Sequence, residues 1–486
     1  MNATNDDTPL AGRWFAMAAL LVAGFMNLID VTIVNVAIPS LQDAFGATDS
    51  QIEWVVAIYI LTFALLLLPM GRLGDRVGRR RMFIAGVCVF TFGSALCGLA
   101  PSIYTLVVAR VVQGIGGAMM TPQTLAIVPS LFAPKERGLA FALFGLSAGL
   151  ASVTGPVLGG FLIGADIQGL DWRPIFLVNV PVGIIAVIGA LKFVPNLPGN
   201  KGLEVDFVGI GLAAITTLLV MFPLIEGRQV GWPLWIFAMM VSALPMLWVF
   251  VWWQRRRAAM GQAQLLPVAL FRNRNFMVGT GIVMLLFAGI PGFFLVLAIL
   301  LQVGNGFTPL QSGLTTIPFS IGVLTASIAA GRLGNRFLRP RISMGGALLA
   351  SCMILLPFVT PQEAGEISRN AFMIPLFMGG LGLGTAISPL FNTVLGQVTD
   401  ADTGSASGAL QSFQQLGGAL GIAVMGQLFF AHVTSGLQAG EGKVAVYSDA
   451  LQLALLFSTV SFVALALLVW RLPAPGASKL DKPQAA

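Results

Sequence analysis

Charged side chains are scarce in this sequence. Of its 486 residues only 27 are Lys or Arg and 20 are Asp or Glu, together 10% of the chain. A soluble domain carries about 25% charged residues, so this chain has too few charges to cover a water-facing surface. Hydrophobic residues make up 56%, and apolar runs of about 18 residues or more, long enough to cross a bilayer, recur along the whole length. The scarcity of charge therefore excludes a soluble protein and predicts a polytopic membrane protein.

Histidine and cysteine are nearly absent as well. The single histidine, His432, cannot build a metal site alone and is interpreted as a polar residue at a helix end. The three cysteines, Cys88, Cys97 and Cys352, all fall in apolar runs and form no Cys-x-x-Cys pair. Disulfides and metal centres therefore have no basis in this sequence. Since no nucleophile–base pair appears either, the sequence predicts neither an enzyme nor a cofactor-binding protein.

The apolar runs predict an all-α fold of membrane-spanning helices. Fourteen spans are expected, at residues 14–37, 53–71, 82–100, 104–126, 138–163, 174–194, 205–225, 233–253, 277–301, 311–331, 342–360, 371–395, 405–431 and 448–470. The first residues lack the basic region of a signal peptide, so the first span is predicted to be retained. An even number of spans places both termini on one side.

The distribution of Lys and Arg predicts which side that is. With the N-terminus in the cytoplasm, 22 of the 27 Lys and Arg residues fall in cytoplasmic segments and only 4 in outer segments. Such an excess is typical of cytoplasmic loops. We therefore expect both termini in the cytoplasm and a location in the cytoplasmic (inner) membrane. The net positive charge is a topology signal, so no nucleic-acid partner is expected.

An internal repeat predicts two related halves. The string GRLGDRVGRRR at 71–81 returns as GRLGNRFLRPR at 331–341. The two loops lie eight spans apart, whereas two six-helix halves would place them six apart, so two helices are inserted between the halves. The expected division is an N-terminal half at 1–194, two inserted helices and a cytoplasmic linker at 195–276, a C-terminal half at 277–470, and a cytoplasmic tail at 471–486.

The first copy of this repeat crowds five arginines around one aspartate. Asp75 sits at a predicted helix end, where a carboxylate can pair with arginines or cap the start of a neighbouring helix. Gly71, Gly74 and Gly78 permit sharp turns and close helix approach. Two interpretations are left open here: a charge cluster that locks one conformation, and a plain positive-inside anchor.

Predicted span four carries a buried cation. Arg110, Gln113, Gly114 and Gly117 in ARVVQGIGGAMM fall on one helical face. An arginine inside a span costs at least about 2.5 kcal/mol, so it should face the bundle interior and have a partner. The string Gly-Ile-Gly-Gly is not a phosphate loop, because no strand precedes it.

Predicted span one carries the most deeply placed acid of the chain. Asp30 lies in MNLIDVTIVNVAIP, with Asn27 three residues before it. An intramembrane acid is by default a functional hypothesis, since a buried carboxyl group can load and release a proton. The alternative is a structural ion pair with Arg110.

Predicted span five is rich in small residues. Its sequence FGLSAGLASVTGPVLGGFL places glycines on one face, which permits tight helix packing. The pair Gly155-Pro156 is expected to kink the helix, and packing alone is a less adequate explanation for it.

Five motifs in order give the chain a family resemblance. It resembles a major facilitator superfamily transporter of the fourteen-span drug:proton antiporter family, which includes EmrB- and QacA-type exporters. The matching strings are LIDVTIVNVAIPSL in span one, GRLGDRVGRRR between spans two and three, ARVVQGIGGA in span four, GPVLGG in span five and DWRPIFLVNVPVG before span six. They cover nearly the whole chain.

The resemblance implies roles for the residues in these motifs. It implies proton coupling by Asp30 and Arg110, and an antiporter hinge, which favours export, at Gly155 and Pro156. It implies a cytoplasmic gate formed by Gly71, Asp75, Arg76, Gly78 and Arg79. Asn27 and Gln113, beside the charged pair, are the candidate substrate-binding residues.

The sequence also departs from the family pattern. Asn335 stands in the second loop copy where the first has Asp75, so the two loops cannot be electrostatically equal. Gln415 stands in span thirteen where relatives often have arginine. No acid lies deep in the predicted spans of the second half, which favours neutral, zwitterionic or weakly anionic substrates over multivalent cations.

Together these observations predict a proton-coupled secondary transporter that exports amphipathic small molecules by alternating access. Its expected partners are a small-molecule substrate, protons and the lipid bilayer, and the expected working unit is a monomer. The main alternative is a dedicated transporter, either an exporter or an importer, of one metabolite such as a vitamin or natural product. A membrane enzyme or a scaffold without transport activity is the weakest hypothesis.

Overall fold

The computed structural model describes most of the chain. The described residues are 12–133, 136–165, 167–196, 198–200, 202–228, 230–333, 336–360, 368–396, 398 and 402–472. Within these ranges all regular secondary structure is helical. The fold is therefore an all-α helical bundle, as expected.

The long helices follow the predicted spans closely. In the first part of the chain they are α1 (Arg13–Ile33), α3 (Asp49–Val77), α4 (Arg79–Gly98), α5 (Ile103–Leu131), α6 (Arg137–Gly164), α7 and α8 (Pro174–Leu177 and Asn179–Phe193), α9 (Phe207–Glu226) and α10 (Leu234–Ala259). In the second part they are α12 and α13 (Arg274–Gly289 and Pro291–Ile299), α15 (Ile317–Leu333), α16 (Leu338–Val359), α17 (Met373–Leu395), α18 (Thr403–Gln438) and α19 (Lys443–Leu468).

Short helical segments join or extend these elements. They are η1 (Val34–Ala37), α2 (Ile38–Phe45), η2 (Ile167–Gly169), α11 (Val268–Arg272), η3 (Leu300–Gly304), α14 (Pro309–Thr315), η4 (Arg369–Phe372) and η6 (Val469–Arg471). Among the described residues, 13 helical segments are long and apolar enough to cross a membrane. The fifth predicted span coincides with α6, a helix of 28 residues.

Local sequence explains where several helices begin. Thr48 and Gln51 form a capping box at the start of α3, and Ser102 and Thr105 form one at the start of α5. Each box satisfies two backbone N–H groups that would otherwise lack partners. Such caps fix the register of the long apolar helices that follow.

The expected loop at 71–81 is wrong, because these residues are almost wholly helical. α3 continues to Val77 and α4 begins at Arg79, so that Gly78 alone lies between them. Gly78 has a φ of 107°, a backbone conformation that favours glycine. Gly71 and Gly74 therefore form no turn, and their role is in helix packing.

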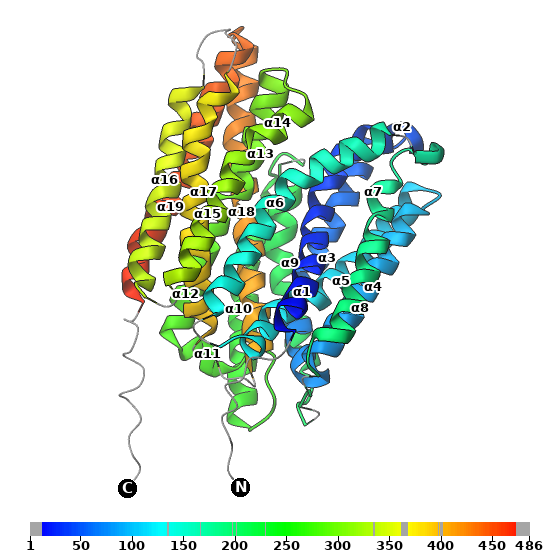
Figure 1. The fold of residues 1–486 in the computed structure, drawn as a ribbon, viewed down its shortest axis with the longest axis vertical. Helices are drawn as coiled ribbons and strands as arrows, with labels where there is room; N and C mark the ends of the chain where they lie inside the picture. The colour runs from blue at the N-terminus through cyan, green and yellow to red at the C-terminus, as the bar shows by residue number, and fades with distance from the viewer. Residues whose placement is uncertain are drawn as a thin grey trace.

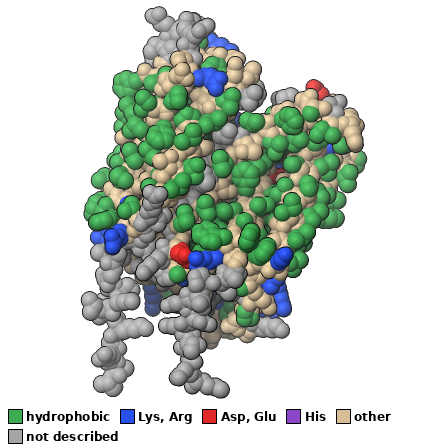
Figure 2. Space-filling model, in the orientation of Figure 1, with side chains coloured by type: hydrophobic (Ala, Val, Ile, Leu, Met, Phe, Trp, Pro, Cys, Tyr) green, Lys and Arg blue, Asp and Glu red, His purple; other side chains and the backbone are tan. Residues whose placement is uncertain are grey.

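The helices form two groups (Figure 1). Helices α1 to α8, coloured blue to teal, gather on one side of the view, and α12 to α19 gather on the other, with α9 and α10 between them. The start of α1 and the end of α19 lie toward the lower end, where α3 meets α4 and α10 meets α11. We call this the basic end, because Arg72 to Arg81 and Arg255 to Arg257 lie there; the opposite end is the far end. Hydrophobic side chains cover most of the visible face between the ends (Figure 2).

Candidate functional site

A buried ion pair lies in the first group of helices. Asp30 of α1 accepts a hydrogen bond from Arg110 Nη1 of α5 at 2.5 Å, and both side chains are almost fully shielded from solvent. Gln113 stands one turn further along α5. Its Nε2 donates to Asp30 Oδ1 at 2.5 Å, and its Oε1 accepts from Arg110 Nη1 at 2.7 Å. The predicted partner of the span-four arginine is thus Asp30.

Two further residues hold the same carboxylate in place. Asn179 Nδ2, at the start of α8, donates to Asp30 Oδ1 at 3.2 Å and to Ser94 Oγ of α4 at 3.3 Å. Ser94 Oγ also accepts from Gln113 Nε2 at 2.8 Å. Sequence reasoning missed both, although Asn179 lies within the motif DWRPIFLVNVPVG. Four helices thus contribute to one polar cluster, and the carboxylate of Asp30 faces three donors.

The guanidinium of Arg110 is held on its other sides too. Its Nε donates to the Val55 carbonyl oxygen at 2.9 Å. Its Cζ lies 4.2 Å from the ring centroid of Tyr59 and 5.9 Å from that of Phe176, within the range of cation–π attraction. Removing one partner of such a buried pair typically costs about 3–5 kcal/mol, because it leaves an uncompensated charge. The cluster is therefore strongly coupled to the packing of α1, α3 and α5.

The two candidate substrate-binding residues lie inside this packing. Asn27 is buried, and its Oδ1 accepts from the Tyr59 hydroxyl at 2.5 Å. Gln113 is fully buried within the Asp30 cluster. In this conformation both side chains are occupied by internal hydrogen bonds, so a substrate could reach them only after the helices separate.

Glycines on α5 make the close packing possible. A Cβ at Gly114 would lie 2.9 Å from the Tyr59 carbonyl oxygen, and one at Gly117 would lie 2.8 Å from Asn27 Oδ1. A Cβ at Gly114 would press on backbone, and one at Gly117 would force the Asn27 amide to move, so glycine is what lets the helices approach this closely. The shared face predicted for span four thus packs against α1 and α3.

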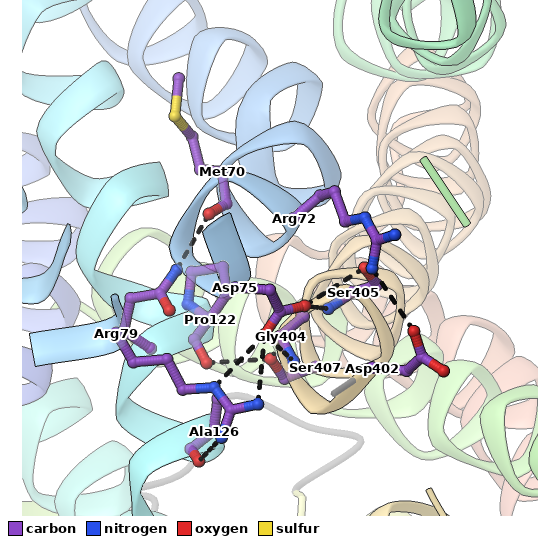
Figure 3. A network of polar contacts seen from close by, with 11 residues as sticks. Met70, Arg72, Asp75, Arg79, Pro122, Ala126, Asp402, Gly404, Ser405 and Ser407 are labelled. Atoms are coloured by element: carbon purple, nitrogen blue, oxygen red, sulfur yellow. Dashed lines mark hydrogen bonds and ion pairs between the residues drawn. The ribbon is translucent and has the colours of Figure 1, made fainter. Parts of the chain in front are cut away.

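A second polar cluster joins the two groups of helices at the basic end (Figure 3). Asp75, near the end of α3, lies against the first turn of α18. Its Oδ1 accepts from the backbone N–H of Gly404 and its Oδ2 from that of Ser405, both at 3.0 Å. Arg79, four residues on, donates to Asp75 Oδ1 from Nη2 at 3.2 Å. The carboxylate therefore pairs with an arginine and also caps a helix, which were the two roles open to it.

The cap works because helix N-termini attract anions. The first backbone N–H groups of α18 have no partner within the helix, and the helix dipole adds partial positive charge there. Asp402, just before α18, receives a hydrogen bond from Arg72 Nη1 at 3.4 Å. Close contact is possible because glycines line it: a Cβ at Gly71 would collide with the Gly404 carbonyl oxygen, and one at Gly408 would lie 2.8 Å from the Leu67 carbonyl oxygen.

The other predicted gate residues surround this contact. Arg79 Nη1 also donates to the Ala126 carbonyl oxygen of α5 at 3.3 Å. The backbone N–H of Asn200 donates to the Asp75 carbonyl oxygen at 2.9 Å. Arg76, half buried, follows on the same helix, and a Cβ at Gly199 would collide with its carbonyl oxygen. The linker after α8 thus lies directly on the end of α3.

The predicted hinge residues lie on α6, where Gly155 packs against α1. Thr32 Oγ1 reaches the Ala151 carbonyl oxygen of α6 at 3.3 Å, and a Cβ at Gly155 would collide with that Oγ1. Pro156 follows in the same helix, but its side chain lies outside the described residues. Since Thr32 is two residues from Asp30, α6 is packed against the helix that carries the buried acid.

The second half differs from the first in its acids. Among the described residues, the buried acids are Asp30, Asp75, Asp206 and Glu226, and the last two lie at the ends of α9 rather than in α12 to α19. Gln415 is half buried on α18, and Asn335 lies outside the described residues. The part of the chain that the structure describes contains no group of three or more His, Cys, Asp or Glu side chains that could hold a metal ion.

A bundle of long apolar helices with a buried acid–arginine pair is typical of a polytopic membrane protein. The chain matches the family model described as Major Facilitator Superfamily over residues 20–422 and 282–486. The chain belongs to this superfamily, and is thus a multi-pass integral membrane protein that handles small molecules rather than an enzyme.

Curated relatives cover most of the chain. It is 38% identical over 423 residues to a "Probable actinorhodin transporter" of Streptomyces coelicolor, covering 87% of this chain and 73% of that protein. It is 33% identical to the "Puromycin resistance protein pur8" of Streptomyces alboniger, covering 85% and 81%. It is 31% identical to the "Methylenomycin A resistance protein" of Bacillus subtilis, covering 93% and 92%.

Solved structures share the fold at low sequence identity. The human organic anion transporter MFSD10 matches with a TM-score of 0.65 and 16% identity, covering 94% of this chain and 100% of that one. The proton:xylose symporter XylE matches with a TM-score of 0.64 and 14% identity, covering 95% and 96%. At these identities the likeness is one of fold alone.

Proposed function

We propose that the chain is a proton-coupled exporter of amphipathic small molecules that works by alternating access. The observation that carries this proposal is the buried Asp30–Arg110 pair, held in a protein whose relatives are named for antibiotic transport or resistance. A protein of this kind needs a site that exchanges a proton and a gate that responds to it. The two polar clusters offer one of each.

The Asp30 cluster suggests how binding of a proton is coupled to movement of the helices. In this conformation the carboxylate faces donors from Arg110, Gln113 and Asn179. A proton on Asp30 would remove the negative charge that holds Arg110, and it would weaken the hydrogen bonds that the carboxylate accepts. Because these side chains come from different helices, gain of a proton favours a different helix arrangement.

The Asp75 cluster is proposed as the cytoplasmic gate. It holds α3 to the start of α18 through charge-assisted hydrogen bonds and an ion pair, while Gly71 and Gly408 let the helices touch. The gate residues Gly71, Asp75, Arg76, Gly78 and Arg79 would stay together while the basic end is closed. They would separate from α18 when it opens. Gly155 and Pro156 are proposed as the hinge on α6.

The experiment that tests the proposal uses purified protein in liposomes. With an inside-acid gradient, labelled puromycin and other amphipathic compounds should move against their concentration gradients, and a protonophore should abolish this movement. Uptake into the acidic lumen corresponds to export from cells. Transport unaffected by the proton gradient would rule out proton coupling.

A narrower function is favoured by one observation. The relatives named above are each associated with a single natural product, actinorhodin, puromycin or methylenomycin A. If only one compound of a broad panel is moved, the protein is a dedicated transporter of a natural product. Comparing uptake with efflux of that compound settles its direction.

The proposed placement is the cytoplasmic membrane, with both termini in the cytoplasm and a monomer as the working unit. Within it, the two six-helix halves are 1–194 and 277–470, and the inserted helices occupy 195–276. This makes the basic end the cytoplasmic end, in agreement with the excess of Lys and Arg there.

Cysteine labelling in whole cells checks this placement. Single cysteines at exposed positions Asn200 and Arg336 should react with a membrane-impermeant maleimide only after the cells are opened. Single cysteines at exposed Gln168 and Gln438 should react in intact cells. The reverse pattern, or labelling of a cysteine at 200 or 336 in intact cells, would overturn the assignment.

A further inference from the structure

The inserted helices α9 and α10 lie between the two groups of helices (Figure 1). Near the basic end, α3 and α18 touch directly through Gly71 and Gly404, and through Leu67 and Gly408. Further along, α9 packs against both helices. Met221 of α9 is fully buried in a cluster with Leu61 and Ala64 of α3, and Leu416 and Ala419 of α18 pack against that cluster. α9 thus packs against α3 and α18 together, and we call the α9–α10 pair, which lies along the seam between these two helices, the wedge.

Aromatic side chains extend this wedge along α3. The Trp54 and Phe222 rings lie 6.3 Å apart, and Phe222 lies 6.4 Å from Trp235 of α10, centroid to centroid. Trp54 is at the far end of α3, so α9 accompanies α3 from the middle of the bundle to that end. Aromatic pairs at these distances add stability beyond the area they bury.

The turn between α9 and α10 fastens the wedge to α18. Trp232 Nε1 donates to Gln427 Oε1 at 2.9 Å, and Arg228 Cζ lies 4.4 Å from the Phe430 ring centroid. Trp232 has a φ of 53°, and its backbone N–H donates to the Gly227 carbonyl oxygen at 2.7 Å, which directs the indole toward α18. From Leu416 to Phe430, α18 covers about 21 Å at 1.5 Å per residue, so the wedge accompanies it over more than half of the hydrocarbon core, which is roughly 30 Å thick.

A polar clamp secures the other end of α9. Asp206 caps α9 by accepting from the Gly209 N–H at 2.9 Å. It also accepts from Trp253 Nε1 at 3.0 Å and from Gln254 Nε2 at 2.8 Å, both on α10. α9 and α10 are thus joined to each other at the basic end and to α18 at the far end.

We propose that the α9–α10 pair seals the α3–α18 seam against the lipid bilayer. Amphipathic compounds dissolve in lipid, and a gap between α3 and α18 would let them diffuse laterally between the bilayer and the interior of the transporter. Met221 and Phe222 occupy that gap, and the Trp232–Gln427 hydrogen bond keeps them there. The benefit of such a seal to export rests on the proposed function; the seal itself does not.

Cysteine reactivity from within the bilayer tests this seal. In a variant lacking Cys88, Cys97 and Cys352, a cysteine at Ala419 faces the wedge, whereas one at Val460, 67% exposed on α19, faces outward. In liposomes without substrate or gradient, a maleimide that partitions into the bilayer should label Cys at 460 at least about tenfold faster than Cys at 419. Equal rates would overturn the proposal.

The Trp232–Gln427 hydrogen bond, which we call the latch, is tested in the same assay by Trp232→Phe and Gln427→Leu. Loss of one hydrogen bond should raise labelling at position 419 about fivefold, and the double variant should add little, because both remove the same bond. Trp248→Phe, which alters an exposed ring on the outer face of α10, is the matched control and should change nothing. No increase in either single variant, with each protein monodisperse, would refute the latch. Since the assay needs no transport, failure of proton-driven export would leave this result standing, and failure of the seal would leave export standing.

Discussion

Asp30→Asn is expected to abolish uphill transport driven by a proton gradient, while substrate binding partly survives. Asparagine can still accept a hydrogen bond from Arg110, but it can neither gain nor lose a proton. It also leaves the fully buried Arg110 without a counter-charge. The cluster would then hold a single protonation state, and the step that links the proton to helix movement would be lost.

The size of the effect follows from the driving force. A proton moving down about 150 mV releases roughly 3.5 kcal/mol, because each 100 mV is worth ~2.3 kcal/mol per charge. One proton per molecule could therefore sustain a gradient of a neutral substrate of roughly 300-fold, since ~1.36 kcal/mol corresponds to tenfold. In Asp30→Asn this ratio should fall to about one. A monovalent cation exchanged for one proton moves no net charge, so for such a substrate the membrane potential should matter little.

The measurement is accumulation of substrate in liposomes with imposed pH and voltage gradients. Asp43→Asn, which removes a carboxylate from an exposed position on α2, is the matched control and should keep the wild-type ratio. Binding measured without a gradient separates loss of coupling from loss of folding. If Asp30→Asn still concentrates substrate on a proton gradient, Asp30 is structural and the coupling residue lies elsewhere.

Asp75→Asn is expected to lower the transport rate severely, with nearly normal expression. The carboxylate accepts backbone N–H groups of Gly404 and Ser405 on separate oxygens, whereas an amide offers one oxygen and turns an NH₂ group toward the other N–H. Hydrogen bonds to charged groups contribute about 1.5–3 kcal/mol each, so the balance between closed and open gate should shift by roughly 10- to 150-fold.

The neighbouring ion pair supplies the control for this gate. Asp402 is 29% exposed and pairs with Arg72 at 3.4 Å, and partly exposed pairs contribute about 1 kcal/mol or less. Asp402→Asn should therefore change the transport rate no more than about fivefold. Wild-type transport by Asp75→Asn would mean that the five arginines at 71–81 are only a positive-inside anchor.

Helix positions and the buried pair could be predicted from the sequence. Apolar runs set the spans, because their length is tied to the bilayer. Arg110 needs a partner inside the membrane, and Asp30 was the deepest acid available. The shared face of Arg110 and Gln113 followed from helical periodicity alone, and the structure places both side chains on Asp30.

The partners of Asp75 could not be predicted in this way. Gly404 and Ser405 contribute backbone N–H groups, which leave no side-chain signature, and they lie some 330 positions away in the sequence. Asn179 and Ser94 were missed for a related reason, since single polar residues in apolar runs are common in membrane helices. The helical course of 71–77 was missed because its glycines were expected to turn the chain rather than to admit a neighbouring helix.

The single-residue junction at Gly78 limits how this protein can be engineered. An inserted residue would change the position and direction of α4 relative to α3, which would carry Arg79 away from Asp75 and from the Ala126 carbonyl oxygen. An epitope tag, a protease site or a fluorescent-protein fusion placed there should therefore inactivate the transporter even though the position lies at the end of the bundle. The turn around Gly440 is the better position for such insertions, because Gly440 is exposed and a Cβ at that glycine would have no neighbour within 4 Å.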